Sequence, residues 1–591
     1  MKTSDFLVER LLAWGVTRVF GYPGDGINGI LGGLQRSGKI EFIQVRHEES
    51  AAFMACAHAK FTGEPGVCLA TSGPGAIHLL NGLYDAKGDH VPVVAIVGQA
   101  ATTAIGGDYQ QEVNLTRLFA DVAHEYVYQV NTPGALRHVV DRAFRTAWGD
   151  RAVTCVIVPK DVQEMDAVPS EPHKHDTIHS SAGFDGGRLV PNDEDLRRAA
   201  AILNAAERPA LLVGAGALRA TDEVMLVAER LGAGVAKALL GKAAVPDDFP
   251  LCTGTIGLLG TGSSSELMRR CDALLMVGTT FPYGEFLPKE GQARAVQIDV
   301  DPRNLGIRYP TELNMLGDAQ ASLRALLPLL NARTETAWAD QIRHSIRHWR
   351  EIERARAFEA ADPINPQRVF YELSDRLPER AILTGDAGTA TNWYARHVMM
   401  RRGMMGSLSG GLATMGSAVP YAIAAKFAYP ERTVIACTGD GAMQMNGINE
   451  LLTVSKYWRT WSNPRLVFLV LHNDDLNQVT WEMRILSGDP KYDASQRLPE
   501  FSYAGFAESI GLRGIRVDTP EQVGPAWDEA LRADRPVVYD AVVAGDVATL
   551  PPHITFDQAT KFARAMLKGD PERSNVIEES LKGILDAVLP R

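Results

Sequence analysis

The chain has 591 residues, of which 46% are hydrophobic and 22% are charged. A chain of that length is too long to fold around a single hydrophobic core, and it indicates roughly three or four domains. The ordinary globular composition excludes long disordered segments. The formal net charge of −11, with no visible basic stripe, argues against a general nucleic-acid surface.

The six cysteines are scattered and show no C-x-x-C spacing. This argues against a zinc site or a disulfide framework and favours buried free thiols. Acidic residues interrupt the apolar pattern at the N-terminus, so a signal peptide is not expected there. No run reaches the roughly 20 apolar residues that span a bilayer. We therefore expect a soluble, cytoplasmic protein.

Short apolar runs alternate with helical patterns along the chain, which is typical of parallel α/β layers. A first block covers residues 1–169, and its strands are expected at residues 19–22, 42–45, 67–70, 93–97 and 155–158. The strand at 42–45 leads through Arg46-His47 into Glu48, Glu49 and an alanine-rich helix. Both acids therefore fall in the first helical turn, where the helix dipole favours them, so a structural role is the alternative to catalysis.

A polar, proline-containing linker at residues 169–179 precedes a middle block at residues 189–330. Its three histidines could form a metal cluster, but no cysteine or paired carboxylate accompanies them, so a solvated linker is favoured. Strands of the middle block are expected at residues 210–213, 274–277 and 295–298. Gly214-Ala-Gly216 follows the first of these strands without the third glycine of a G-x-G-x-x-G turn, which makes it a weak dinucleotide signal.

A third block covers residues 362–545, and a C-terminal helical tail is expected at residues 546–591. Strands of the third block are expected at residues 381–384, 434–437, 466–471 and 537–541. Gly439-Asp440-Gly441 follows the second strand and Asn473 follows the third, with a helix expected at residues 446–458 between them. Oxygen ligands at strand ends suit Mg²⁺, and a helix N-terminus suits a phosphate. A simple tight turn is the alternative, because Asp-Gly is common in turns.

Several motifs occur together in a fixed order along the chain. They are Gly21-Tyr-Pro-Gly24, Arg46-His47-Glu48-Glu49, Ser72-Gly-Pro-Gly75 with His78 and Asn81, the run from His90 to Gly98, and Gly439-Asp440-Gly441 with Asn473. In this combination the chain resembles the thiamine diphosphate enzymes of the pyruvate oxidase and acetolactate synthase group over nearly its whole length. The resemblance implies three Rossmann-like α/β domains with parallel sheets: a pyrimidine-binding first block, a central FAD-type block and a diphosphate-binding third block.

The resemblance also implies roles for individual residues at the cofactor. Glu48 contacts N1′ of the aminopyrimidine and favours the tautomer that activates C2 of the thiazolium ring. Met415 is the bulky wedge that bends the cofactor. Mg²⁺ takes Asp440, Asn473 and the main-chain oxygen of Asp475. The other residues expected at thiamine diphosphate are Asp25, Ser72, Asn81, Ala387, Gly388, Thr389, Ala413, Gly439, Gly441 and Ala442.

The middle block resembles the FAD-holding domain of pyruvate oxidases. Asp299 follows a strand, where a carboxylate can accept ribose hydroxyls. The residues expected at FAD are Gly214, Gly216, Thr255, Gly257, Gly278, Thr279, Thr280, Phe281, Asp299 and Asp318. Acetolactate synthases also bind FAD in this domain, so FAD alone does not indicate redox chemistry. Ordinary strand-to-helix turns are the structural alternative for the glycines.

Glu482 and Asp25 favour the oxidase branch, because acetolactate synthases usually carry tryptophan at the position of Glu482. Two residues depart from the family pattern: Gln110 stands where an aromatic ring is usual, and Gln478 where a large apolar side chain is frequent. The expected catalytic set comprises Glu48, His78, Gln110, Gln111, Gln478 and Glu482. The resemblance implies decarboxylation of a 2-oxo acid, pyruvate, and oxidation of the resulting enamine through FAD to acetate or acetyl phosphate.

Two other functions stay open at this point. An acetolactate synthase-like carboligase would join the enamine to a second 2-oxo acid or aldehyde. A catalytically dead relative would act as a binding protein, although the intact motif residues argue against it. The resemblance also places the cofactor between blocks of different subunits, so a homodimer is the minimum and a homotetramer is expected. The amphipathic stretch 577–589 permits peripheral membrane contact, but a packed terminal helix is favoured.

Overall fold

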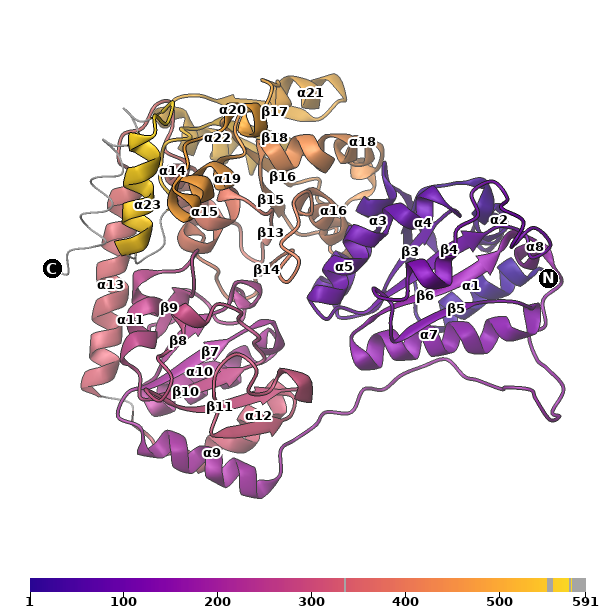
Figure 1. Ribbon diagram of the computed structural model, residues 1–591, viewed down its shortest axis with the longest axis horizontal. Coiled ribbons are helices and arrows are strands. Elements are labelled where there is room, and N and C mark those ends of the chain that lie inside the picture. Colours follow the sequence, from indigo (N-terminus) through magenta and orange to yellow (C-terminus); the bar gives the residue numbers. More distant parts are fainter. Residues whose placement is uncertain (334–335, 550–555, 573–575, 577–591) are drawn as a thin grey trace.

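The computed structural model describes residues 1–333, 336–549, 556–572 and 576. Three α/β units follow one another along the chain, and each contains a parallel sheet of six strands flanked by helices (Figure 1). The three sheets lie within residues 18–159, 209–316 and 382–542, inside the three predicted blocks. The predicted fold class is therefore confirmed, while the outer boundaries of the blocks stay predictions.

The first sheet has the strand order β2-β1-β3-β4-β6-β5. Its strands are β1 Arg18–Gly21, β2 Glu41–Gln44, β3 Gly66–Ala70, β4 Val93–Gln99, β5 Tyr126–Gln129 and β6 Val153–Pro159. Alternate residues of β4 face opposite sides, as the two-residue period of a strand requires. Val93 and Ala95 pack with α3 (Glu48–Thr62) and α5 (Leu80–Gly88), whereas Val94 and Ile96 pack with α1 (Thr3–Ala13) and α7 (Leu136–Asp150).

The middle sheet has the order β12-β11-β10-β7-β8-β9. Its strands are β7 Pro209–Val213, β8 Gly234–Lys237, β9 Cys252–Thr255, β10 Ala273–Val277, β11 Arg294–Asp299 and β12 Leu313–Leu316. The helices of this unit are α9 Asp193–Ala205, α10 Thr221–Leu231, α11 Gly262–Arg270 and α12 Ala319–Leu326. Helix α13 (Ala337–Ala357) then leads to the third unit (Figure 1). Because the chain places β8 and β9 on one side of β7 and β10 on the other, its connections reverse between β7 and β10.

The third sheet has the order β14-β13-β15-β16-β18-β17, which repeats the connectivity of the first sheet. Its strands are β13 Ile382–Gly385, β14 Met405–Leu408, β15 Val434–Gly439, β16 Leu466–His472, β17 Arg513–Val517 and β18 Val537–Val542. Its main helices are α14 Pro366–Arg376, α15 Thr389–His397, α16 Ala418–Ala428, α18 Ile448–Tyr457, α21 Tyr503–Ser509 and α22 Val523–Ala530. The connections of this sheet reverse between β13 and β15.

Helix α3 of the first unit packs against helix α16 of the third unit, and both belong to one hydrophobic cluster. Small side chains such as Ala52, Ala55 and Cys56 on α3 are fully buried, as is Ala422 on α16. Short side chains allow two helix backbones to approach closely. The first and third units are therefore joined by a shared core rather than by a surface contact.

All twelve predicted strands are present, and each lies within two residues of its predicted ends. The six strands that the sequence pattern missed are β5, β8, β9, β12, β14 and β17. Five of these six lie at the edges of their sheets. Edge strands are short and partly exposed, so they lack the continuous apolar run that marks a central parallel strand. In β12, for example, buried and exposed residues alternate.

The helix predicted at residues 446–458 begins earlier than expected. Helix α17 (Asp440–Ala442) starts at the aspartate itself, continues through a π-helical turn at Met443–Gly447 and joins α18. The described residues contain no helix that is both long and apolar enough to cross a membrane. The amphipathic stretch predicted at 577–589 lies outside the described residues.

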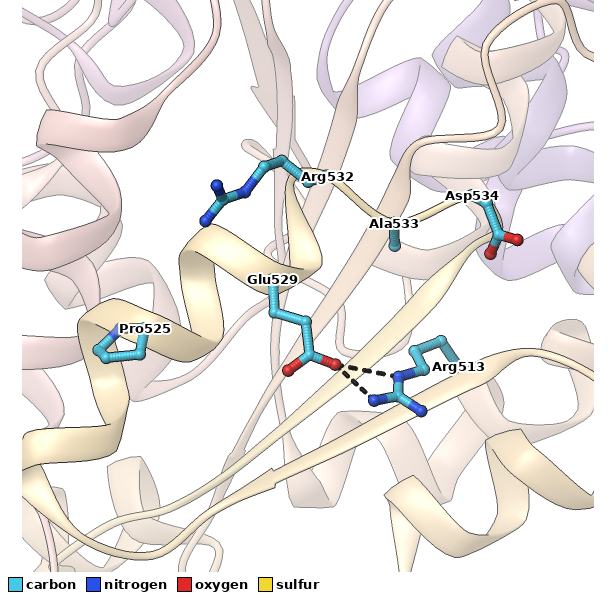
Figure 2. A pocket seen from close by; sticks show the side chains of 6 residues that line it. All are labelled: Arg513, Pro525, Glu529, Arg532, Ala533 and Asp534. Carbon is cyan, nitrogen blue, oxygen red and sulfur yellow. Dashed lines mark hydrogen bonds and ion pairs between the residues drawn. The ribbon is translucent and has the colours of Figure 1, made fainter.

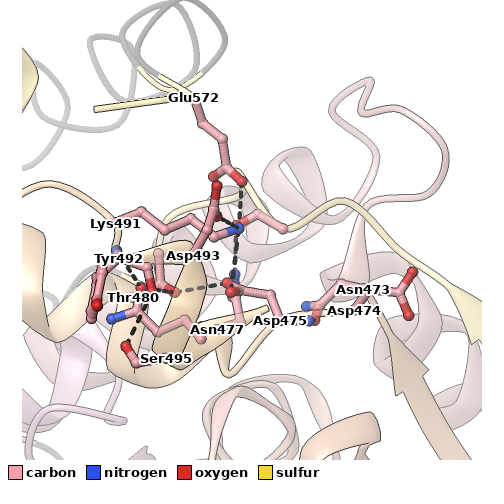
Figure 3. A network of polar contacts seen from close by, with 12 residues as sticks. Asn473, Asp474, Asp475, Asn477, Thr480, Lys491, Tyr492, Asp493, Ser495 and Glu572 are labelled. Carbon is pink, nitrogen blue, oxygen red and sulfur yellow. Dashed lines mark hydrogen bonds and ion pairs between the residues drawn. The ribbon is translucent and has the colours of Figure 1, made fainter. Parts of the chain in front are cut away.

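The C-terminal segment that includes α23 (Phe556–Leu567) is attached to the third unit by buried charges. Arg484 has a fully buried side chain and donates to both carboxylate oxygens of Asp570, at 2.9 and 2.8 Å, and to Glu572 at 2.8 Å. Lys491 also pairs with Glu572 at 2.7 Å (Figure 3). Arg484 and Lys491 therefore anchor the segment next to the loop that follows Asp475.

Replacing Asp570 with alanine should release this segment. Removing one partner of a buried ion pair costs about 3–5 kcal/mol, so the amides of α23 should exchange with solvent at least about 100-fold faster. Hydrogen exchange measured by mass spectrometry checks this. Asp489→Ala is the matched control, because it removes an exposed pair with Lys568 on the same segment, worth at most about 1 kcal/mol. Equal acceleration in both variants would contradict the assigned role of Arg484.

Candidate active site

Asp440 lies at the carboxyl end of β15 and connects that strand to the end of β16. Its side chain is buried, with Oδ2 accepting the N–H groups of Asn473 at 2.8 Å and Asp474 at 2.6 Å. Oδ1 accepts the N–H of Gly441 at 2.8 Å. Burial raises the pKa of Asp440 to about 6, although these hydrogen bonds favour the ionised form. Asp440 and Asn473 are thus brought together, as the sequence predicted.

Asp475 completes the predicted metal-binding group. The Asn473 side-chain oxygen accepts the N–H of Asp475 at 3.2 Å. The Asp475 carboxylate is held by Asn477 at 3.1 Å, by Thr480 at 2.8 Å and by Lys491 at 3.3 Å (Figure 3). Because the carboxylate is engaged in these contacts, the main-chain oxygen of Asp475 stays the predicted ligand. The donor set is made only of oxygen atoms, so these residues fit a hard cation such as Mg²⁺.

Sequence reasoning missed a buried histidine behind this turn. His472 contacts Asp540 through Nδ1 at 2.8 Å and Asp474 through Nε2 at 3.0 Å. Burial disfavours the charged imidazolium, but the Asp540 carboxylate and the nearby acids outweigh it and raise the pKa of His472. The available signal was Asp540 itself, a fully buried acid in the otherwise apolar strand β18. The pair orients the loop that carries Asn473.

Glu48 begins helix α3, and its side chain is buried beside a histidine. Its Oε2 lies 2.9 Å from Nδ1 of His78. His47 caps the helix by accepting the N–H of Glu49 at 3.2 Å, and its ring stacks on that of His78 with centroids 4.5 Å apart. The N–H of Arg46 donates to Glu450 of the third unit at 2.8 Å. Glu48 and His78, two members of the expected catalytic set, therefore form one hydrogen-bonded unit near the contact with the third unit.

Met415 lies beside the Asp440 turn. A Cβ atom placed on Gly441 would stand 3.4 Å from the terminal methyl of Met415, and Ala413 nearby has a positive φ of 52°. Buried Asp386, which the sequence analysis did not select, accepts the N–H groups of Gly416 at 2.8 Å and Ala418 at 2.9 Å. Burial raises the pKa of Asp386 to about 7. An aspartate directly after a predicted strand was the signal that could have identified it.

Ala387, Gly388 and Thr389 follow β13 and begin α15. They stand across from Asp440 at the point where the strand connections of the third sheet reverse. In open parallel sheets this crevice is where ligands bind. Gly439, Gly441 and Ala442 belong to the Asp440 turn itself. The structure therefore gathers the predicted diphosphate-side residues at one edge of the sheet.

Other predicted residues are more exposed. Gln110 and Gln111 lie on an exposed loop, where Gln111 contacts Ser72 at 3.4 Å and has a positive φ of 61°. Asp25 is exposed and faces Lys160 at 3.4 Å. Among the residues that the structure describes, Asp25 and Gln110 make no polar contact with Glu48 or Asp440. Their predicted roles at the cofactor stay predictions.

Gln478 and Glu482 are four residues apart on α19 (Asn477–Glu482) and contact each other at 3.0 Å. Asn392 of α15 donates to Gln478 at 2.9 Å. This forms a polar row beside the loop that carries Asn473 and Asp475. The structure thus joins Gln478, which departs from the family pattern, to Glu482, which the sequence analysis connected with the oxidase branch.

In the middle unit, three predicted glycines meet where the strand connections reverse. Gly216 donates its N–H to the carbonyl of Gly278 at 3.0 Å, and a Cβ on Gly278 would lie only 2.5 Å from Cα of Gly216. Gly214 follows β7 on the same side, and a Cβ on it would lie 2.4 Å from the oxygen of Gly278. Such close backbone approach requires glycine at these positions, which lie at the strand ends where ligands bind in open parallel sheets.

The remaining residues predicted at FAD divide into two groups. Asp299 ends β11, is buried, and has its pKa raised by that burial. Thr279 accepts the N–H of Phe281 at 3.2 Å, Gly257 has a positive φ of 100°, and Thr280 is half-buried. By contrast, Thr255 donates to Ala395 of the third unit at 3.2 Å, and Asp318 caps α12 through Ala321 at 2.9 Å. These last two contacts are structural.

A separate surface hollow lies at the far edge of the third sheet, between β17 and α22 (Figure 2). An exposed ion pair between Arg513 and Glu529, with a shortest distance of 2.5 Å, crosses it. Its lining residues are Arg513, Pro525, Glu529, Arg532, Ala533 and Asp534. None of the predicted site residues lines this hollow. The candidate site is therefore the polar edge around Asp440 and the buried Glu48, and not this hollow.

Three family descriptions match the chain in the same order as its three units. Residues 1–118 match the thiamine pyrophosphate enzyme N-terminal TPP binding domain, residues 196–326 the central domain, and residues 386–541 the C-terminal TPP binding domain. The chain belongs to the thiamine pyrophosphate (thiamine diphosphate) enzyme family.

Individual relatives match over nearly the full length. YdaP of Bacillus subtilis (strain 168), named as a thiamine pyrophosphate-containing protein, is 37% identical over 98% of this chain and 97% of its own. The pyruvate oxidase of Lactiplantibacillus plantarum is 32% identical over 94% of this chain and 91% of its own. The acetolactate synthase isozyme 3 large subunit of Escherichia coli (strain K12) is also 32% identical, over 93% and 96% respectively.

Replacing Asp440 with asparagine should weaken thiamine diphosphate binding in the presence of Mg²⁺ by about 100-fold, because it removes the negative charge of a predicted ligand of the cation. Isothermal titration calorimetry of thiamine diphosphate with saturating Mg²⁺ measures this. Asp534→Asn, at the rim of the distant hollow, makes the same chemical change and should leave the affinity unaltered. An unchanged affinity in Asp440→Asn would contradict the assignment of the metal site.

Proposed function

We propose that this chain is a thiamine diphosphate- and Mg²⁺-dependent enzyme that decarboxylates pyruvate and transfers the released electrons to FAD. The observation that carries the proposal is the buried Asp440 turn, which joins two strand ends and brings Asp440 together with Asn473 and Asp475. Their oxygen atoms are the kind of ligand that Mg²⁺ takes. The helical run that begins at Asp440 adds backbone N–H groups suited to a diphosphate.

Different residues of the chain would act at the two ends of the cofactor, the diphosphate and the aminopyrimidine. Asp440, Asn473 and Asp475 would hold the cation that neutralises the diphosphate. Glu48, buried and hydrogen-bonded to His78, would hold and exchange a proton at N1′ of the aminopyrimidine. When bound, thiamine diphosphate supplies a nucleophilic carbon that adds to the keto group of a 2-oxo acid and accepts the electrons left as CO₂ departs.

Two features of the middle unit support FAD binding. Its strand order matches the arrangement that binds dinucleotides at the reversal of the connections, here between β7 and β10. Gly214, Gly216 and Gly278 cross at that point, and glycines at such a strand end are typical of a turn that a pyrophosphate approaches. Asp299 stands at the end of the next strand, β11, where it could accept ribose hydroxyls.

The pyruvate oxidase and the acetolactate synthase relatives match this chain at the same identity. The choice of an oxidase is therefore based on individual residues and not on overall similarity. Glu482 and Asp25 support the oxidase. The polar row of Asn392, Gln478 and Glu482 favours the second candidate, a carboligase that joins the decarboxylated fragment to a second 2-oxo acid or aldehyde. Such a row offers hydrogen bonds to an additional carbonyl or carboxyl group.

We also propose that a second copy of the chain completes the site, in a homodimer or homotetramer. Large apolar side chains are exposed near the predicted site, including Tyr109 at 61%, Met445 at 64% and Val479 at 43%. Exposed apolar groups of this size around a polar site are typical of a surface that a partner covers. The six buried free cysteines agree with a reducing, cytoplasmic location.

Anaerobic addition of pyruvate to the purified protein separates the two candidates. The oxidase predicts bleaching of the flavin spectrum together with CO₂ and acetate or acetyl phosphate. Formation of acetolactate with the flavin still oxidised would instead establish the carboligase. In either case Glu48→Gln should lower the rate of CO₂ release by about 100-fold or more. Full activity in that variant would exclude the proposed role of Glu48.

A further inference from the structure

Helix α5 presents a row of polar side chains toward the third unit. Asn81, Asp85 and Asp89 are spaced four residues apart, which places them on one face of the helix and its C-terminal cap. Asp85 is fully buried, and the side chain of Asp89 is only 2% exposed. Each of the three makes a hydrogen bond to the third unit. Buried acids in such a row require specific partners.

The partners belong to the loop at residues 409–416, here called the Met415 loop. At one end, Asp89 accepts the N–H groups of Gly410 at 2.9 Å and Gly411 at 2.5 Å. Lys60, near the end of α3, pairs with Asp89 at 2.6 Å and donates to the carbonyl of Leu408 at 2.8 Å. A Cβ on Gly411 would lie 2.6 Å from the oxygen of Gly88, so the loop lies directly against the end of α5.

At the other end, Asn81 donates to the Thr414 hydroxyl at 3.0 Å, and that hydroxyl donates to the carbonyl of Met415 at 3.2 Å. Asn81 also contacts Glu49, the neighbour of Glu48, at 2.5 Å. Asp386 then accepts the N–H of Gly416. The Met415 loop therefore runs along α5 and is fastened on both sides of Met415.

A third contact joins α5 to helix α16 directly behind the loop. The hydroxyl of Tyr421 donates to Asp85, accepts from Lys60 at 2.7 Å and lies 3.1 Å from Sγ of Cys56. Burial disfavours the charged ammonium, but Asp89 and the neighbouring acidic groups raise the pKa of Lys60. The ammonium thus neutralises Asp89 within the interior of the protein.

The loop would not hold this conformation unaided. Its sequence, Ser409-Gly-Gly-Leu-Ala-Thr-Met-Gly416, contains three glycines, and Ala413 adopts a positive φ that costs about 1 kcal/mol or more. Hydrogen bonds to a carboxylate are stronger and more directional than those between neutral groups. Anchoring by buried polar groups from another unit is therefore what fixes the position of Met415.

We infer that Asn81 and Asp89 are positioning residues, which hold Met415 beside Gly441 by fastening its loop to α5, with Lys60 neutralising Asp89. The inference rests on the proposed function, in which Met415 supports the cofactor. It assigns Asn81 a role through Thr414, in place of the direct cofactor contact that the sequence resemblance implied. It also makes the first unit of a chain responsible for the geometry of the third unit of the same chain.

The test measures how fast the C2 proton of bound thiamine diphosphate exchanges for deuterium. The rate is compared between Asp89→Asn and the wild type, and NMR after an acid quench detects the exchange. Small displacements of a supporting group strongly reduce rates that depend on alignment. We expect exchange to slow by about 10- to 100-fold, while the Kd for thiamine diphosphate with Mg²⁺ changes less than about 3-fold. Lys87→Met is the matched control, because Lys87 lies on the same helix in a more exposed pair with Asp121, and it should exchange at the wild-type rate.

Met415→Ala provides a double-mutant cycle. If Asp89 acts through Met415, the doubly substituted protein should exchange no more slowly than the slower single variant. Asn81→Ser removes the hydrogen bond at the other end of the Met415 loop and leaves the buried ion pair of Lys60 and Asp89 intact. Its exchange rate tests the inference if Asp89→Asn does not fold. An unchanged exchange rate in both anchor variants, or rate losses that multiply in the cycle, would overturn the inference. Failure of the wild type to bind thiamine diphosphate would overturn the proposed function first.

Discussion

The packing of α3 against α16 determines how the first unit, which carries Glu48, meets the third unit, which carries Met415. Both helices are buried along most of their length, and small residues on α3 bring the two backbones close together. Glu48 stands at the beginning of α3, and Met415 comes just before α16. The contact between the two helices therefore brings both residues next to the core that the first and third units share. Hydrogen bonds from α5 then hold the Met415 loop in place.

The three sheets share one arrangement of apolar and polar residues, although they have two different strand orders. In each, the apolar centres of the strands supply stability, and predicted site residues follow the carboxyl ends of strands. The first and third sheets share their order, and between them they hold Glu48 and Asp440. The middle sheet has the dinucleotide-type order, and there Gly216 and Gly278 cross. Glu48 and Asp440 thus lie in other units of the chain than these crossing glycines.

Much of this arrangement could be predicted from the sequence, because central parallel strands are continuous apolar runs and the motifs at their ends keep a fixed order. Edge strands such as β17 were missed, since partial exposure removes that signal. Within the site, Asp440 and Asn473 were identified, but the pair of His472 and Asp540 was not. These two residues are 68 positions apart, and only the neighbouring strands β16 and β18 bring them together. Asp386 was missed for a similar reason, because its partners are backbone groups of a distant loop.

A crystal structure of the protein with Mg²⁺ and thiamine diphosphate would show how the coenzyme is held at its two ends. We expect the cation at about 2.0–2.1 Å from oxygen atoms of Asp440 and Asn473. We also expect the Glu48 carboxyl within hydrogen-bonding distance of N1′ of the aminopyrimidine. A coenzyme bound elsewhere, or one whose pyrimidine ring contacts no Glu48 from either copy of the chain, would rule out these two roles.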